Sequence, residues 1–76
     1  MLSAAQIRAA RALLAWSARE LADKSGVSLA TIQRLERQGG VPVAHSRTLT
    51  DLKRAFEDAG VEFIGTPDDK PGVRLK

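Results

Sequence analysis

Two helix-start signals, eleven residues apart, constrain this chain more than any other feature. Ser17 begins a Ser-x-x-Glu sequence, the pattern of a capping box, in which the serine hydroxyl and the glutamate satisfy the first free N–H groups of a helix. Ser28 is a second N-cap candidate. Between them, Gly26 tolerates the positive φ of a tight turn. The sequence therefore predicts a short helix over Ala18–Lys24, a turn, and a second helix over Leu29–Gln38.

The apolar residues of this segment have the spacing of a packed helix-turn-helix unit, which we place at residues 18–37. These residues are Leu21, Ala22, Gly26, Val27, Ile32 and Leu35. Ala22 has to be small because the second helix crosses close to it, and Gly26 lets the chain reverse within few residues. An ordinary helix pair from another bundle is the alternative. The spacing and the two caps in register favour the helix-turn-helix.

Two further helices are expected around this unit. One begins after Ser3 and carries one apolar face, with Leu13 beside it; the residues of that face are Ile7, Ala10 and Leu14. The other follows a loop over Gly40–Arg47 and begins at a capping box of Thr48 and Asp51. Its apolar stripe consists of Leu49, Leu52, Phe56 and Ala59. Gly39-Gly40 and Gly60 are expected to end the third and fourth helices.

The segment after Gly60 is predicted to be β-structure. Val61–Ile64 is rich in β-forming residues, Val73–Leu75 alternates with charged residues, and Gly65–Gly72 is rich in turn formers. A two-stranded hairpin alone is barely stable in water, so the strands should pack on something. They could fold back on the fourth helix of their own chain. They could also pair with a second copy, which would cover exposed strand edges.

Size and composition limit the classes of function. Seventy-six residues form one domain at most, with little room for a catalytic cavity. We divide it into a helical domain over residues 1–60 and a β tail over residues 61–76. The absence of cysteine excludes disulfides and thiolate metal sites and fits a reducing, cytoplasmic compartment. We expect no signal peptide and no membrane span.

Charge is distributed unevenly along the chain. Residues 1–47 hold seven basic and three acidic residues, a net +4, whereas residues 48–76 hold five basic and six acidic residues, a net −1. A basic surface of this kind suits a phosphate-bearing partner. An ordinary solvated face is the alternative explanation for the same charges.

At this point the sequence resembles a known family. The stretch from Ile7 to Glu36, centred on WSARELADKSGVSLATIQRLE, is similar to the phage-repressor-like (Xre, Cro/cI type) helix-turn-helix regulators. The tail segments AGVEFI and GVRL extend the resemblance toward short bacterial regulators. It implies a mainly α, lambda-repressor-like domain of four to five helices, here with a C-terminal β-hairpin or paired strands. It also implies binding to double-stranded DNA, usually as a homodimer.

The resemblance assigns roles to residues of the unit. The second helix would lie in the major groove with its N-terminal half toward the bases. The residues expected to contact bases are Ser28, Leu29, Ala30, Gln33 and Arg34. Arg34 is the best candidate for a bidentate bond to guanine. Leu29 and Ala30 are apolar where many relatives carry polar side chains. The base contact that we expect of these two residues is therefore with a thymine methyl group.

A second set is expected to contact phosphates, and so to position the protein on DNA without specifying sequence. This set is Ser17, Ala18, Arg19, Thr31, Arg37, Gln38, His45, Ser46 and Arg47. At Ala18 only the backbone N–H is available, because alanine stands where many relatives have glutamine. The resemblance also implies a structural ion pair between Arg11 and Glu36.

Two classes of function stay open. The first is a small transcriptional regulator, a repressor that acts by occlusion. The second is a protein-interaction module on the same fold, such as an antitoxin or an anti-activator. Catalysis is not expected, since His45 is the only histidine, and the pair Asp68-Asp69 lies far from it in sequence. No motif for a cofactor, a metal or a small-molecule ligand is present.

Overall fold

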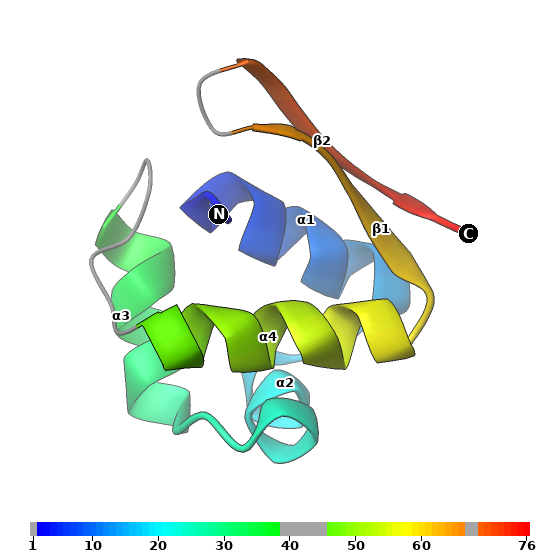
Figure 1. Cartoon of the computed structure of the whole chain (residues 1–76). Helices are drawn as coiled ribbons and strands as arrows, with labels where there is room; N and C mark the ends of the chain where they lie inside the picture. The colour runs from blue at the N-terminus through cyan, green and yellow to red at the C-terminus, as the bar shows by residue number, and fades with distance from the viewer. Residues whose placement is uncertain (1, 39–45, 67–68) are drawn as a thin grey trace.

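The computed structural model describes residues 2–38, 46–66 and 69–76, which form four helices followed by two antiparallel strands (Figure 1). The elements are α1 (Ala4–Leu14), α2 (Ala18–Ser25), α3 (Leu29–Gln38), α4 (Ser46–Asp58), β1 (Val61–Thr66) and β2 (Asp69–Leu75). The strands lie against α1 and α4, while α2 and α3 pack on the other side of these two helices. This mainly helical fold with a C-terminal strand pair confirms the predicted class.

The helix-turn-helix unit has the caps that the sequence predicts. The Ser17 hydroxyl accepts a hydrogen bond from the Glu20 backbone N–H, and the Glu20 carboxylate accepts one from the Ser17 N–H, each 3.1 Å long. Gly26 has φ +76°, and its N–H donates to the Ala22 carbonyl at 2.9 Å. Ser28 then caps α3, since its hydroxyl accepts from the Thr31 N–H at 3.2 Å.

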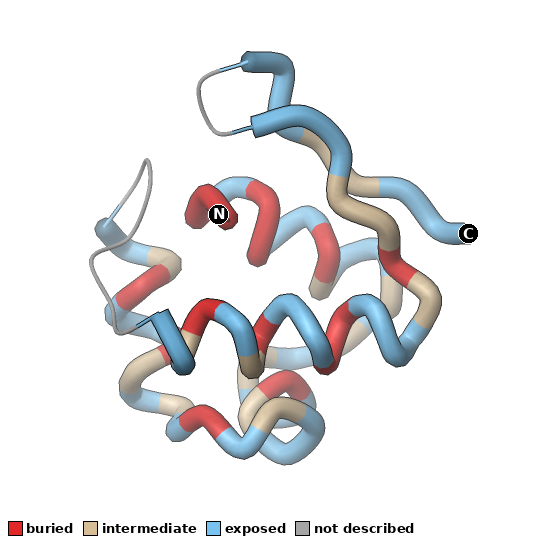
Figure 2. Tube along the Cα trace, viewed as in Figure 1, coloured by how far each residue is buried: buried red, intermediate tan, exposed pale blue. Residues whose placement is uncertain are grey.

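One hydrophobic core joins all six elements (Figure 2). The helix-turn-helix unit supplies part of this core through the residues that the sequence predicts. Leu21, Val27, Ile32 and Leu35 are buried, and the half-buried Ala22 packs against the core. From α1, Ile7 and Ala10 are buried and Leu14 is half-buried, but Leu13 remains 40% exposed. Leu13, which was expected beside that apolar face, thus lies outside the core.

The predicted start of α4 was wrong. The helix begins at Ser46, so Thr48 lies within its first turn instead of capping it, and Ser46 and Arg47 are helical instead of belonging to the loop. Asp51 does not reach back to Thr48. It lies 4.0 Å from the Arg47 guanidinium, one helical turn away, and this ion pair favours extending the helix over residues 46–48. Residues 39–45, with the rest of the predicted loop and the predicted glycine stop, lie outside the described residues.

The end of α4 differs slightly from the predicted stripe. Leu49, Leu52 and Phe56 are buried, yet Ala59 is exposed, and Ala55 takes its place in the core. The helix ends at Asp58, and the chain then turns through Gly60, whose φ is +97°. That turn carries Ala59 away from the core and directs β1 back across the helices.

The two strands pair with each other within one chain. Their register joins Val61 to Leu75 and Phe63 to Val73. The pairing extends to Thr66 and Asp69, so the strands are longer than predicted and the turn is shorter. The register shifts at Gly65, whose φ is +72°, which identifies a bulge. A Cβ atom at this position would overlap the carbonyl oxygens of Asp69 and Lys70, so only glycine fits here.

Gln6 joins the hairpin to the start of α1. Its side-chain oxygen accepts from the Ser3 N–H at 3.0 Å, which completes a capping box with the Ser3 hydroxyl. Its amide nitrogen donates to the carbonyls of Gly72 at 3.1 Å and Ile64 at 3.4 Å. Because this side chain is almost fully buried, its polar atoms depend on these partners.

Three aromatic rings connect the hairpin to the helices. Trp16 stacks on Phe56 with centroids 5.9 Å apart, and Phe56 meets Phe63 edge-on at the same separation. Trp16 lies in the link between α1 and α2, Phe56 on α4, and Phe63 on β1. The hairpin is therefore part of the core, in which Val61 is fully buried.

Candidate nucleic-acid interface

The outer face of α3 is the exposed surface of the helix-turn-helix unit. Ile32 and Leu35 point into the core. Since successive residues of a helix are about 100° apart, the opposite face is set by these two positions. It carries four exposed residues, which we call the α3 ridge: Ala30, Gln33, Arg34 and Arg37.

The residues expected to contact bases differ in how well they are placed. Ala30, Gln33 and Arg34 lie on the α3 ridge, whereas Leu29 is half-buried on its flank. Ser28 is exposed, but its hydroxyl caps α3 and also donates to the Thr31 hydroxyl at 2.8 Å. A base contact by Ser28 would therefore compete with the bonds that begin the helix.

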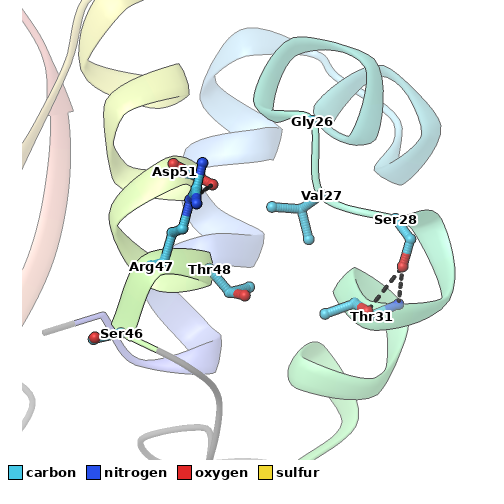
Figure 3. Close-up of a pocket in the computed structure, with 8 residues that line it drawn as sticks. All are labelled: Gly26, Val27, Ser28, Thr31, Ser46, Arg47, Thr48 and Asp51. Carbon is cyan, nitrogen blue, oxygen red and sulfur yellow. Dashed lines mark hydrogen bonds and ion pairs between the residues drawn. The ribbon is translucent and has the colours of Figure 1, made fainter.

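One open hollow lies between the turn of the unit and the start of α4, with a volume of about 540 Å³. Figure 3 shows Ser28 and Thr31 on one side and Arg47 and Thr48 facing them from the other. The N-terminal ends of α3 and α4 both border this hollow, and the free N–H groups of helix N-termini favour anions. Three of the residues expected to contact phosphate line it: Thr31, Ser46 and Arg47.

A second hollow, of about 470 Å³, borders the other flank of α3. Its lining comes from three helices and consists of Arg8, Arg11, Ala18, Gln33, Glu36 and Arg37. Three arginines against one glutamate give it a net charge of +2. It also contains the first residue of α2, so that helix start is open to an anion on this side.

Arg11 and Glu36 are paired with each other in the lining of this second hollow. The Arg11 Nε and Nη2 atoms donate to the two carboxylate oxygens at 2.8 and 2.7 Å, which is a bidentate bond between α1 and α3. The Nη1 atom donates to the Trp16 carbonyl at 3.1 Å. Both side chains are largely buried, at 22% and 12% exposure. The pair that the resemblance implies is thus present in the structure.

The contact with Glu36 favours the charged form of Arg11. The hydrogen bond to Glu36 raises the pKa of Arg11 above its ordinary value, burial opposes this, and the Glu36 charge adds to it. A raised pKa means that the stabilising charge is fully present below the ordinary arginine value and is lost only above it. The ion pair with Glu36 is therefore insensitive to the ionisation of Arg11 at any pH below the ordinary arginine value.

Arg8 is a residue that the sequence reasoning missed. It stands one helical turn before Arg11, and its Nη1 atom donates to the Glu36 carbonyl in the last turn of α3 at 2.5 Å. Its spacing of three residues from Arg11 was the available signal, because such residues share a helix face.

The remaining predicted phosphate contacts are more scattered. Ser17 and Arg19 are exposed at the start of α2, and Gln38 is exposed at the last residue of α3. Neither hollow includes these three residues among those that line it. His45 lies outside the described residues. The structure therefore brings together part of the predicted set, in two groups on either side of the α3 ridge.

A short helix, a tight glycine turn and a second helix with an exposed polar face define a helix-turn-helix protein. Residues 7–42 match the family described as Helix-turn-helix. This match supports the assignment of residues 7–42 to the phage-repressor-like (Xre, Cro/cI type) helix-turn-helix family, which is a family of DNA-binding regulators. No curated protein matches the chain.

Two other kinds of site, a membrane-spanning helix and a cluster of metal ligands, are absent from the described residues. None of their helices is long and apolar enough to cross a membrane. No group of three or more histidine, cysteine, aspartate or glutamate side chains in this part of the chain could hold a metal ion.

Proposed function

We propose that this protein is a transcriptional regulator that binds a specific duplex sequence through α3 and represses by occlusion. One observation carries the proposal: the α3 ridge lies between two polar hollows that hold predicted phosphate contacts. A helix placed in the major groove needs this arrangement, with base contacts along its exposed face and backbone contacts on both sides.

Within this proposal, base recognition rests mainly on Gln33 and Arg34. Arginine bonds guanine in a bidentate manner and glutamine bonds adenine, while Ala30 offers only a methyl group, which suits thymine. Thr31, Ser46 and Arg47 would hold one DNA strand, and Arg37 with the Ala18 N–H the other. We assign Ser17, Arg19, Gln38 and His45 outer phosphate contacts.

To test this proposal, bound duplexes are selected from a random pool. The selected site is then titrated by fluorescence anisotropy at two salt concentrations. Binding should weaken steeply with salt, because bound phosphates release their counterions. A site of two half-sites about 34 Å apart would give the oligomeric state as well. If no duplex binds even at low salt, the proposal fails.

We further propose that the protein acts as a homodimer, in which the hairpin of one copy meets that of another. Each strand has only one neighbour in the two-stranded sheet of the described residues, and the hairpin exposes Ile64 (41%) and Leu75 (52%). Pairing of the free edges would cover both. Sedimentation should show a dimer that Leu75→Glu converts to a monomer; a monomeric parent protein would contradict the proposal.

The second candidate function is a protein-interaction module, such as an antitoxin or an anti-activator. It is favoured by the small or apolar residues at Leu29, Ala30 and Ala18, which are poor partners for bases and phosphates. The titration separates the two candidates, since this module would have no salt-dependent affinity for duplex DNA. For the regulator, the bacterial cytoplasm is the compartment that we propose.

A further inference from the structure

The second hollow contains a cation to which no role has been given. Arg8 extends from α1 and lines this hollow together with Arg37 and Gln33 of the α3 ridge. It is exposed, and the bond from its Nη1 atom to the Glu36 carbonyl uses one of the five N–H donors of its guanidinium. The remaining donors are available for an oxygen-bearing anion.

The other residues of the hollow do not serve that purpose equally. Arg11 bonds both Glu36 oxygens and the Trp16 carbonyl, so three of its five donors and its charge are used within the fold. Ala18 presents only a methyl group, so no side chain from the start of α2 extends into the space. Any anion that binds there must take its charge contacts from α1 and from the α3 ridge.

We propose that Arg8 binds a backbone phosphate of the DNA, opposite Arg37, and so takes over a contact that the side chain of Ala18 cannot make. This inference rests on the proposed function and deepens it. Because the same guanidinium bonds the last turn of α3, the phosphate contact would also position that helix. Arg8 is thus a binding and positioning residue, and it lines the same hollow as Gln33, which the proposed function assigns to base recognition.

The test compares Arg8→Gln with Arg54→Gln on the selected duplex. Both changes remove one positive charge from an exposed helical arginine, but Arg54 lies on α4 and does not line this hollow. The slope of log K against log salt should fall by about 0.9 for Arg8→Gln, the value of one phosphate contact, and should stay unchanged for Arg54→Gln. Affinity at low salt should drop about tenfold for Arg8→Gln.

Two additional measurements separate a phosphate contact from a structural effect. Arg8→Lys keeps the charge and should retain the parent slope. In the second, duplexes that carry one uncharged methylphosphonate each are scanned with the parent protein and with Arg8→Gln. At one position the methylphosphonate should weaken DNA binding by the parent protein and leave DNA binding by Arg8→Gln unaffected.

The outcomes distinguish the two proposals. If the parent protein binds no duplex, the proposed function fails. If it binds, and Arg8→Gln and Arg54→Gln have equal slopes and equal sensitivity to every methylphosphonate, then only the role of Arg8 is overturned. A lower slope for Arg8→Gln, together with one methylphosphonate position that weakens binding by the parent protein alone, supports the inference. This conclusion holds even if Arg8→Gln also lowers the melting temperature.

Discussion

The bond between Arg11 and Glu36 is the contact on which the position of α3 depends most directly. Replacing Arg11 by alanine leaves a largely buried carboxylate without its partner, and we expect the free energy of unfolding to fall by about 3 kcal/mol. Urea unfolding measures this. Arg54→Ala removes an exposed arginine from α4 and should change stability by less than about 0.5 kcal/mol. Equal stabilities of the two variants would contradict the prediction.

Gly65 is the residue at which the hairpin tolerates no side chain. A Cβ atom there would overlap two backbone carbonyls, so Gly65→Ala should cost about 1–3 kcal/mol in strain. Gly72→Ala is the matched control, since the nearest atom to its Cβ would be the Ile64 Cβ at an ordinary 4.0 Å. Thermal melts should show a clear loss for the first variant and little change for the second.

Arg34 is the residue on which base discrimination depends in the proposed function. Arg34→Ala should reduce the preference for the selected site over a variant with its guanine replaced, by about 1–3 kcal/mol. Binding to unrelated duplex should weaken much less. Competition titrations with the two duplexes measure the difference. An unchanged preference would remove Arg34 from the set of base contacts.

At the scale of elements, the sequence was sufficient where one local rule acts alone. The caps at Ser17 and Ser28 and the turn at Gly26 are local, and α2 and α3 lie within one residue of the predicted bounds. The start of α4 was missed because two signals competed there. Thr48 and Asp51 form a valid capping sequence, but Asp51 pairs with Arg47 in a helix that begins earlier.

In the candidate site, too, the features set by local spacing could be predicted, and those that depend on how the helices pack could not. The exposed face of α3 follows from the spacing of its buried residues, so Ala30, Gln33 and Arg34 could be predicted. The second hollow could not, because it needs α1 placed beside α3. Its spacing from Arg11 places Arg8 on the same helix face, but this spacing does not predict that Arg8 bonds the Glu36 carbonyl, 28 residues away.

The attachment of the hairpin to α1 gives a prediction at the same scale. Gln6→Leu removes the two donors that bond the Ile64 and Gly72 carbonyls and leaves these partly buried acceptors without that partner. Amide exchange should therefore accelerate in β1 and β2 more than in α2. Ser3→Ala is the control, because it removes only the hydroxyl of the α1 capping box. Equal acceleration in α2 and in the strands would show that Gln6 stabilises the whole fold instead.

For the whole molecule, we expect one cooperative unfolding transition. Trp16 stacks on Phe56, which also meets Phe63, so the only tryptophan reports on α4 and the hairpin together. Tryptophan fluorescence and far-ultraviolet circular dichroism should give coincident urea curves. A chain that ends at Gly60 would lose Val61 and Phe63 from the core and should be largely unfolded. Separate transitions, or a folded truncated chain, would contradict this view.

The hydrogen bonds of Gln6 also bear on how the nascent chain folds during its synthesis on the ribosome. The partners of this side chain stand 58 and 66 residues further along the chain. The helix-turn-helix unit therefore leaves the ribosome early. The hydrophobic core that it belongs to is complete only after the hairpin has been synthesised. Until then the nascent chain exposes the apolar residues that Val61 and Phe63 later cover, and it competes with proteases and chaperones for that interval. Under the proposed function, a nascent chain should therefore bind duplex DNA only after residues 61–76 have been synthesised.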